Sequence, residues 1–246
     1  MRKTWAIIRR ELIAYFSSPL AYIVMTAFLL MQGYIFYLIV SFLNNPQTPA
    51  MTPLRLFFGG TIFFWLFLLF VVPVITMRLI AEERRSGTIE VLLTSPVTEV
   101  QVIAAKFAAA LTFYVALWLP TVLYVVVLTR HSEIDLGPVL AGYVGVLLLG
   151  FLFLAVGTFA STLTDNQLIA AIIAFAVMVI FFSIGLVEQL VMSSAVKSVL
   201  GHMNLWNQMD DFAKGIVDSR HVIYQLSVGV LFLFLAAKSL EVKKWR

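Results

Sequence analysis

The residue types that carry most catalytic and metal chemistry are sparse in this chain of 246 residues. There is no cysteine, and the three histidines, His131, His202 and His221, are widely separated in the sequence. A zinc site requires histidine, cysteine or acidic ligands that converge on one point. We therefore interpret the histidines as solvated or interfacial residues, and we expect neither a metal site nor a catalytic residue in this chain.

One acidic residue, Glu188, lies near the end of a long apolar stretch. An acid inside a membrane is a functional candidate by default, and ion-coupled transporters need ionisable groups near the bilayer midplane. Glu188 is close to the end of its stretch, so we expect its side chain to reach the surface instead. The sequence also contains no GxxxxGKS or GxxxxGKT pattern, so we expect no nucleotide bound through a P-loop and no cofactor in this chain.

The most unusual polar segment is AEERRSGTIEVLLTSP, residues 81–96, which lies between two almost purely apolar stretches. We expect the helix of the preceding stretch to continue through AEERRS and to break at Gly87, because glycine is a poor helix former. The residue before a proline leaves the helical region, so Pro96 ends the helix that follows the break. Thr98 and Gln101 then have the spacing of a capping box that starts the next helix.

Residues 88–94, between these two breaks, predict a short helix with two different faces. Its apolar face carries Ile89, Leu92 and Leu93, and its polar face carries Glu90 and Thr94. A short helix with an apolar face, held away from the membrane, is suited to docking into another protein. The alternative interpretation of the same residues is a solvated, charged loop.

The remaining sequence predicts an all-α polytopic membrane protein with six transmembrane helices. Its mean hydropathy is +0.98 and 12% of its residues are charged, whereas soluble domains have about 25%. A helix needs about 20 apolar residues to cross a hydrocarbon core of roughly 30 Å. The apolar stretches reach that length and lack the alternation of a β-barrel. We expect the spans near residues 20–43, 56–78, 103–128, 138–163, 168–190 and 221–240.

The distribution of lysine and arginine predicts which side of the membrane each connection faces. With six spans, both termini lie on one side. That side carries all of the 17 basic residues except Arg55, Arg130, Lys197, Lys214 and Arg220. We therefore expect the termini to face the cytoplasm. We attribute the basic isoelectric point of about 9.4 to this bias and to attraction for the lipid bilayer, and we expect no nucleic-acid partner.

The first 18 residues predict an amphipathic helix before the first span. Apolar side chains recur at helical spacing: Trp5, Ile8, Leu12 and Tyr15. Charged side chains lie mostly away from them: Arg2, Arg9, Arg10 and Glu11. We expect this segment to be an interfacial elbow helix that lies among the lipid headgroups, with Trp5 as its anchor. The alternative is that these charges act only as a topology signal.

The long connection at residues 191–220 predicts one or two short helices on the outer surface. Four apolar residues sit at helical spacing within it: Met209, Phe212, Ile216 and Val217. Asp210 and Asp211 are of a type that caps the start of a helix. Glycines in the predicted fourth span, Gly142, Gly145, Gly150 and Gly157, indicate close helix contacts, either within one chain or between two copies.

Several of these residues resemble the pattern of type-2 ABC transporter permeases. That pattern has a glutamate, a GT-x-E-x-LL run, a proline and a lysine between spans two and three, and it is matched by Glu83, Gly87, Thr88, Glu90, Leu92, Leu93, Pro96 and Lys106. The opening RRELIAYFSSPLAYIV is also similar to the family. The stretch HMNLWNQMDDFAKGIVDSRHVIYQLSV resembles the subgroup of gliding-motility and nitrous-oxide-reductase maturation permeases, in which the positions of His202, Phe212, Gly215, Asp218 and Tyr224 recur.

The resemblance implies a single transmembrane domain over residues 1–246, located in the inner membrane of a bacterial or archaeal cell, with three special segments. These are an elbow helix at 1–18 with Trp5, Arg9, Arg10 and Leu12; a cytoplasmic coupling segment at 79–102; and an outer helical segment at 191–220 with His202, Phe212, Gly215 and Asp218. The implied ATPase-coupling residues are Glu83, Arg84, Arg85, Gly87, Thr88, Ile89, Glu90, Leu92, Leu93 and Pro96.

The resemblance also implies a function that this chain performs with partners. Two permease subunits, either two copies of this chain or this chain with a paralogue, would pair with two separate ATPase subunits. These ATPases would bind ATP and Mg and would move the spans through the coupling helix. The resemblance leaves the cargo open, although a pathway lined by Phe, Tyr, Met and Gly would suit a lipidic, peptide or other bulky substrate.

Two other functional classes compete with this interpretation. The first is a transport-incompetent membrane anchor that passes ATPase motion to an outer-domain partner through residues 191–220. The second is a membrane-embedded enzyme, such as a protease or lipid transferase, but the sequence offers no evident nucleophile and base for it.

Overall fold

A computed structural model describes residues 2–43, 55–88, 98–130 and 135–244. Within these ranges all regular structure is helical, and six helices are long and apolar enough to cross a membrane. The spans are built from α2 (Pro19–Leu43), α4 (Ile62–Thr76) with α5 (Ala81–Arg85), α7 (Glu99–Trp118) continuing through η2 (Leu119–Thr121) into α8 (Val122–Thr129), α9 (Leu136–Leu163), α10 (Gln167–Leu190) and α13 (Ser219–Lys244). The other elements are α1 (Arg2–Ser17), the wide helical turn η1 (Leu56–Gly60), α11 (Ser194–Met203) and α12 (Leu205–Ala213). The predicted all-α fold with six spans is confirmed.

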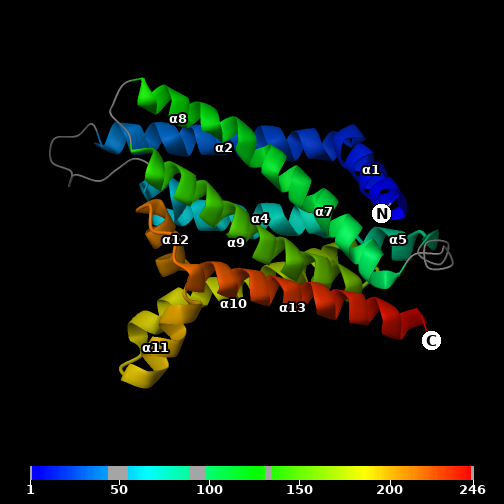
Figure 1. Ribbon diagram of the computed structural model, residues 1–246. Helices are drawn as coiled ribbons and strands as arrows, with labels where there is room; N and C mark the ends of the chain where they lie inside the picture. The colour runs from blue at the N-terminus through cyan, green and yellow to red at the C-terminus, as the bar shows by residue number, and fades with distance from the viewer. Residues whose placement is uncertain (1, 44–54, 89–97, 131–134, 245–246) are drawn as a thin grey trace.

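The spans form an elongated bundle with two distinct ends (Figure 1). Both chain termini and α5 lie at one end, which we call the terminal end. Helices α11 and α12 lie at the other, which we call the distal end. Helix α9 occupies the centre and packs against α4, α7, α10, α12 and α13. An even number of crossings brings the termini together, as the six-span prediction requires.

Glycines on α9 explain why this helix can occupy the centre. The four predicted contact glycines, Gly142, Gly145, Gly150 and Gly157, face respectively the side chains of Phe58, Phe212, Tyr114 and Thr76. A Cβ at any of these positions would overlap its neighbour. In a membrane, helices associate through close packing rather than hydrophobic burial. The sequence left open whether these contacts form within one chain or between two, and the structure places all four within one chain.

The second span begins later than the predicted range of 56–78, because α4 starts at Ile62, and with α5 it extends to Arg85. Residues Leu56–Gly60 form a wide turn instead, in which Gly59 has a φ of 111°. That conformation strains residues with a Cβ but not glycine. The indole Nε1 of Trp65 donates to the Gly59 carbonyl oxygen at 3.0 Å and fixes the turn against α4. The predicted helical continuation into AEERRS is also interrupted, because a turn at residues 77–80 separates α4 from α5.

The predicted start of the third span is confirmed. Thr98 Oγ1 accepts from the Gln101 backbone N–H, and the Gln101 side chain accepts from the Thr98 backbone N–H, both at 3.3 Å. This reciprocal capping satisfies two of the donors that a helix start leaves unpaired.

The distal connection contains two short helices, as predicted, but their details differ from the prediction. Asn204, not an aspartate, caps α12, and its Oδ1 accepts from the Trp206 N–H at 2.8 Å. Asp210 and Asp211 lie in the last part of that helix. Helix α12 buries one face, where Met209 and Phe212 are fully buried, and its other face carries the exposed Asn207 and the partly exposed Asp210 and Asp211. The bulk of Phe212 fits against Gly145, a pairing between residues too far apart in the sequence for local spacing to indicate.

Candidate functional site

The described part of the predicted coupling segment is held by a serine of the central helix. Ser161 on α9 is fully buried, and its hydroxyl accepts from the backbone N–H groups of Ile80 at 3.0 Å and Ala81 at 3.1 Å. The same hydroxyl donates to the Met77 carbonyl oxygen at 3.2 Å. The first N–H groups of a helix lack intrahelical partners. Ser161 therefore supplies the missing acceptor at the start of α5 and fixes this short helix to α9.

The break at Gly87 that the sequence predicts is confirmed. Helix α5 ends at Arg85, and the Gly87 N–H donates to the Arg84 carbonyl oxygen at 3.2 Å. Gly87 itself has a φ of 70°, in the left-handed region that favours glycine. The chain therefore changes direction here. Five of the predicted coupling residues lie outside the described residues: Ile89, Glu90, Leu92, Leu93 and Pro96.

Beside α5, four charged side chains from three helices form what we call the Lys106 cluster: Arg10 and Glu11 of α1, Glu83 of α5 and Lys106 of α7. The Lys106 Nζ atom lies 3.0 Å from Glu11 Oε1 and 3.2 Å from Glu83 Oε1. Arg10 Nη2 lies 2.6 Å from Glu83 Oε1 and 3.0 Å from Glu11 Oε1. Two cations thus balance two carboxylates at the terminal end of the bundle.

Because the Lys106 side chain is buried, its charge requires partners within the protein. The Lys106 side chain is only 2% exposed, and an unpaired charge at such a position carries a large desolvation cost. Partial burial lowers the pKa of Arg10, but hydrogen bonding and charge from Glu11 and Glu83 raise this pKa more, so it lies above the usual arginine value. The guanidinium therefore stays charged, and the cluster acts as a fixed joint between α1, α5 and α7.

Helix α1 is attached to the bundle by further contacts beside this cluster. The Tyr15 hydroxyl donates to the Ile75 carbonyl oxygen at 2.8 Å, and its buried ring stacks on Phe113 at 5.1 Å between centroids. The Arg78 guanidinium lies 5.3 Å from the centroid of the same ring. These contacts join α1 to the end of α4 and to α7.

The predicted elbow residues divide between the core and the surface. Leu12 packs partly buried against the core, whereas Arg9 and Arg10 are exposed. Trp5 is 63% exposed, although it is a large apolar residue. An uncovered tryptophan on an amphipathic helix is what membrane-surface anchoring requires. The placement of α1 among lipid headgroups stays a prediction.

The remaining described coupling residues surround the end of α5. Arg84 is half-buried and Arg85 is exposed. The Thr88 Oγ1 atom lies 2.9 Å from the Ser86 hydroxyl and donates weakly to the Glu83 carbonyl oxygen at 3.4 Å. These local hydrogen bonds close the turn around Gly87 and set the direction in which the chain leaves α5.

Two residues that matter here, Glu11 and Ser161, are absent from the predicted coupling and elbow residues, and Lys106 entered only through the family pattern. A lone lysine within an apolar helix is itself a signal, since such charges are rare and normally paired. Glu11 is a complementary charge on the predicted amphipathic helix at the start of the chain. Nothing in the sequence distinguishes Ser161 from other small residues of the spans.

The predicted residues of the distal segment do not form a single site. Phe212 is buried against Gly145, and the Gly215 N–H donates to the Phe212 carbonyl oxygen where α12 ends. His202 Nδ1 donates to the Ser198 carbonyl oxygen at 2.7 Å. Asp218 accepts from the Arg220 N–H at 2.8 Å, which lowers the pKa of its carboxyl group. Of the four predicted residues of this segment, only His202 and Asp218 line the same cavity.

Glu188 is partly exposed at the distal end of α10, and its carboxylate also accepts hydrogen bonds that the sequence did not predict. Its Oε2 atom accepts from the side-chain amides of Asn204 at 2.5 Å and Asn207 at 3.2 Å. Beside it, Gln225 Nε2 donates to Gln208 Oε1, and Gln208 Nε2 donates to the His202 carbonyl oxygen, both at 2.8 Å. Gln208 and Gln225 are fully buried. These polar contacts attach the distal helices to α10 and α13.

An ion pair attaches α12 to the turn before the second span. Arg55 Nε lies 2.7 Å from Asp210 Oδ1, and Lys214 pairs with the same carboxylate. Partial burial raises the pKa of Asp210, but the hydrogen bonds and charges of Arg55 and Lys214 lower it more, so this pKa lies below its ordinary value.

The part of the chain that the structure describes contains no group of three or more histidine, cysteine, aspartate or glutamate residues that could hold a metal ion. The polar clusters at both ends instead join helices to one another. Their chemistry is that of structural attachment and of electrostatic recognition.

Comparison with known protein families shows which family the chain matches. The family described as ABC-2 family transporter protein matches residues 45–201. The matched region covers more than half of the chain and includes the predicted coupling segment and Lys106. Comparison with curated proteins gives no match, and the resemblance to gliding-motility and nitrous-oxide-reductase maturation permeases stays a prediction. The family match and the six apolar helices together show that the chain belongs to the ABC-2 transporter family and is a multi-pass membrane component of an ABC transporter.

Proposed function

We propose that this chain is a permease subunit that moves substrate across the inner membrane with motion received from separate ATPase subunits. The observation that carries this proposal is the Lys106 cluster, which joins α1, α5 and α7 at the terminal end. Members of the ABC-2 family work with an ABC ATPase in general. A joint between several helices, which includes α5 directly before the predicted coupling helix in the sequence, is where such a partner can act on the spans.

The contacts around α5 support a defined route for this motion. A force applied beyond Gly87 reaches α5 first. From there it passes to α7 through Glu83 and Lys106, to α1 through Glu83 and Arg10, and to α9 through the Ser161 hydroxyl. Because α9 packs against most of the other helices, movement of α5 would be distributed over the bundle.

The proposed assembly contains two ATPase subunits and two permease subunits, the second being another copy of this chain or a paralogue. ATP and Mg would act in the ATPases, and we propose no cofactor for this chain. The bias of basic residues supports an orientation with the termini and the coupling segment in the cytoplasm. The exposed Trp5 supports contact between α1 and the bilayer surface.

Residues 88–94 would form the coupling helix that enters a groove of the ATPase. Ile89 and Leu93 would be buried there, and Glu90 would lie at the rim. Replacing Leu93 with aspartate would place an unpaired charge in the groove, at a cost of about 3–5 kcal/mol. Glu90 would contribute roughly 0–1 kcal/mol to assembly, as exposed ion pairs do.

Affinity purification of the tagged chain from its native membranes tests this proposal. We expect a P-loop ATPase to co-purify at two ATPases for two permeases, to be lost with Leu93→Asp, and to be kept with the matched charge insertion Thr94→Asp. Co-purification that survives Leu93→Asp would contradict the docking role. ATP hydrolysis by the purified chain alone would contradict the assignment of ATP hydrolysis to a separate subunit.

The second candidate is an anchor that passes ATPase motion to an outer partner without transporting anything. The buried Gln208–Gln225 pair favours it, because it ties the distal helices to the last span. Reconstitution of the purified complex in proteoliposomes separates the two. ATP-driven movement of a lipid or peptide supports the permease, whereas ATPase activity that responds only to an added outer-domain protein supports the anchor.

A further inference from the structure

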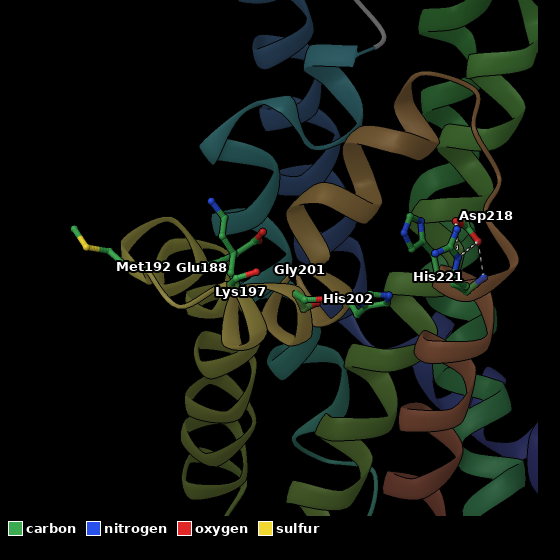
Figure 2. Close-up of a pocket in the computed structure, with 10 residues that line it drawn as sticks. Glu188, Met192, Lys197, Gly201, His202, Asp218 and His221 are labelled. Atoms are coloured by element: carbon green, nitrogen blue, oxygen red, sulfur yellow. Dashed lines mark hydrogen bonds and ion pairs between the residues drawn. The ribbon is translucent and has the colours of Figure 1, made fainter.

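A polar cavity of about 580 Å³ opens at the distal end, between the end of α10, helix α11 and the start of α13. We call it the distal cavity. Six of its lining residues carry its chemistry: Glu188, Lys197, Ser198, His202, Asp218 and Arg220. Figure 2 shows Glu188 and Lys197 on one side, Asp218 and His221 on the other, and His202 between them. The coupling mechanism proposed above uses none of these residues.

Part of the charge in the distal cavity is already matched within the chain. Arg220 Nε lies 3.2 Å from Asp218 Oδ2, so these two charges compensate each other. The Oε2 atom of Glu188 is occupied by the amides of Asn204 and Asn207. Two groups then remain for a ligand. Among the described residues, Lys197 has no ion-pair partner and Glu188 Oε1 accepts no hydrogen bond.

The balance of these groups indicates the charge of the ligand. With its histidines neutral, the cavity carries two cations, Lys197 and Arg220, and two anions, Glu188 and Asp218. An anion would be attracted by an excess of cations, and a cation by an excess of carboxylates. A cavity with one available ammonium group and one available carboxylate oxygen is complementary to a zwitterion that presents an anionic acceptor and a cationic hydrogen-bond donor.

The rim of the distal cavity is apolar and continuous with the outer surface of α10. Met192 lines the cavity and is fully exposed, at 101% of its reference area, and the neighbouring Leu190 is 81% exposed. Other uncovered apolar side chains lie nearby on α10 and α11: Leu186, Val187, Val196 and Val199. Helix α11 projects sideways from the distal end of the bundle (Figure 1). An amphipathic helix beside the end of a span, with its apolar side chains uncovered, is suited to the membrane interface.

We infer that the distal cavity binds the headgroup of a zwitterionic phospholipid that carries a primary amine. The phosphate contacts the Lys197 ammonium and the Ser198 hydroxyl, and the amine donates to Glu188 Oε1. The acyl chains pass over Met192 and Leu190 onto the apolar surface of α10. A lipid accounts for both observations at once, because a soluble zwitterion would leave the apolar rim uncovered.

Binding of phosphatidylethanolamine, phosphatidylcholine and phosphatidylglycerol with identical acyl chains to the detergent-purified full-length protein, measured by native mass spectrometry, tests this inference. The trimethylated amine of phosphatidylcholine cannot donate a hydrogen bond. We therefore expect phosphatidylethanolamine to bind roughly tenfold more tightly than phosphatidylcholine, the value of one charge-assisted hydrogen bond.

Three variants assign the effect to named groups. Lys197→Gln should weaken the binding of all three lipids. Glu188→Gln should abolish the preference for phosphatidylethanolamine over phosphatidylcholine, while its remaining carbonyl oxygen still accepts from Asn204 and Asn207. Arg130→Gln removes another exposed cation, at the end of α8, and should change nothing. Unchanged thermal denaturation of each variant shows that the fold is intact.

Two kinds of result would overturn the inference. One is equal affinity for phosphatidylethanolamine and phosphatidylcholine in the wild-type protein, or wild-type affinity in Lys197→Gln. The other is competition by soluble phosphoethanolamine as strong as that by the lipid, which would assign the cavity to a soluble zwitterion. Lipid binding and ATPase co-purification are measured separately. A negative result for lipid binding would therefore not contradict the proposed coupling function, and a negative result for co-purification would not contradict lipid binding.

Discussion

Lys106 is a buried cation whose carboxylate neighbours come from two other parts of the chain. Glu11 is 95 residues away in the sequence, and Glu83 belongs to the short helix before Gly87. Buried ion pairs add little stability compared with apolar packing, but the loss of one partner is expensive because the other charge stays buried. The cluster is therefore better understood as a device that fixes the relative positions of three helices.

Removing the Lys106 charge should accordingly be costly. Lys106→Met leaves Glu11 and Glu83 close together without their shared cation, and we expect a loss of about 3–5 kcal/mol, visible as a lower midpoint of thermal denaturation in detergent. Lys238→Met is the matched control. Lys238 is 54% exposed and pairs with Glu241, so its loss should cost about 0–1 kcal/mol. Equal shifts for the two variants would show that the cluster is not a structural joint.

Gly87 should set the direction of the residues that follow it rather than the binding of the ATPase. A Cβ at Gly87 would meet no atom within 4 Å, so only its φ of 70° restricts substitution. Gly87→Val should strain the turn and misdirect the following residues, because β-branched residues disfavour positive φ. We expect the ATPase to stay bound while its hydrolysis is uncoupled from transport. Gly87→Asn, which tolerates this φ, should keep coupling, and uncoupling of both variants alike would contradict this explanation.

At the scale of elements, the apolar stretches predict the six spans because length and hydropathy alone decide whether a helix can cross a bilayer. The capping box at Thr98 was also predictable, since its two partners are three residues apart. The late start of α4 and the contacts that bury one face of α12 were not predictable, because they depend on residues that are distant in the sequence. Phe212 against Gly145 and Ser161 against Ile80 are such contacts. The same reason hid the ion pair between Lys106 and Glu11.

The attachment of α12 to the turn η1 should depend on pH. The folded protein holds the pKa of Asp210 below its ordinary value. The ionised Asp210 carboxylate therefore stabilises the fold fully at pH values above the ordinary aspartate range, and this stabilisation is lost as the pH falls through the lowered pKa. Acidification should therefore release α12 from Arg55, with a small effect because the pair is partly exposed. The protection factors of the α12 amides, which correct hydrogen exchange for its intrinsic dependence on pH, should fall at low pH in the wild type, whereas Asp210→Asn should have lower protection factors already at neutral pH and lose this pH dependence.

At the scale of the whole molecule, the account requires that the two ends of the bundle face opposite sides of the membrane. The chain has no cysteine, so single cysteines report their positions without background. Ser95→Cys should resist an impermeant thiol reagent added to intact cells, because the coupling segment is expected in the cytoplasm. Ser194→Cys, at the start of α11, should react. The opposite labelling pattern would reverse the proposed orientation.

The most direct test of the central claim is site-specific photocross-linking from the coupling segment in native membranes. A photoreactive residue at position 93 in place of Leu93 should cross-link to a protein that contains a P-loop ATPase sequence, identified by mass spectrometry. The same residue at position 199, in place of Val199 on α11, should give no such product. Absence of an ATPase from the products at position 93, or its capture from position 199, would contradict the account.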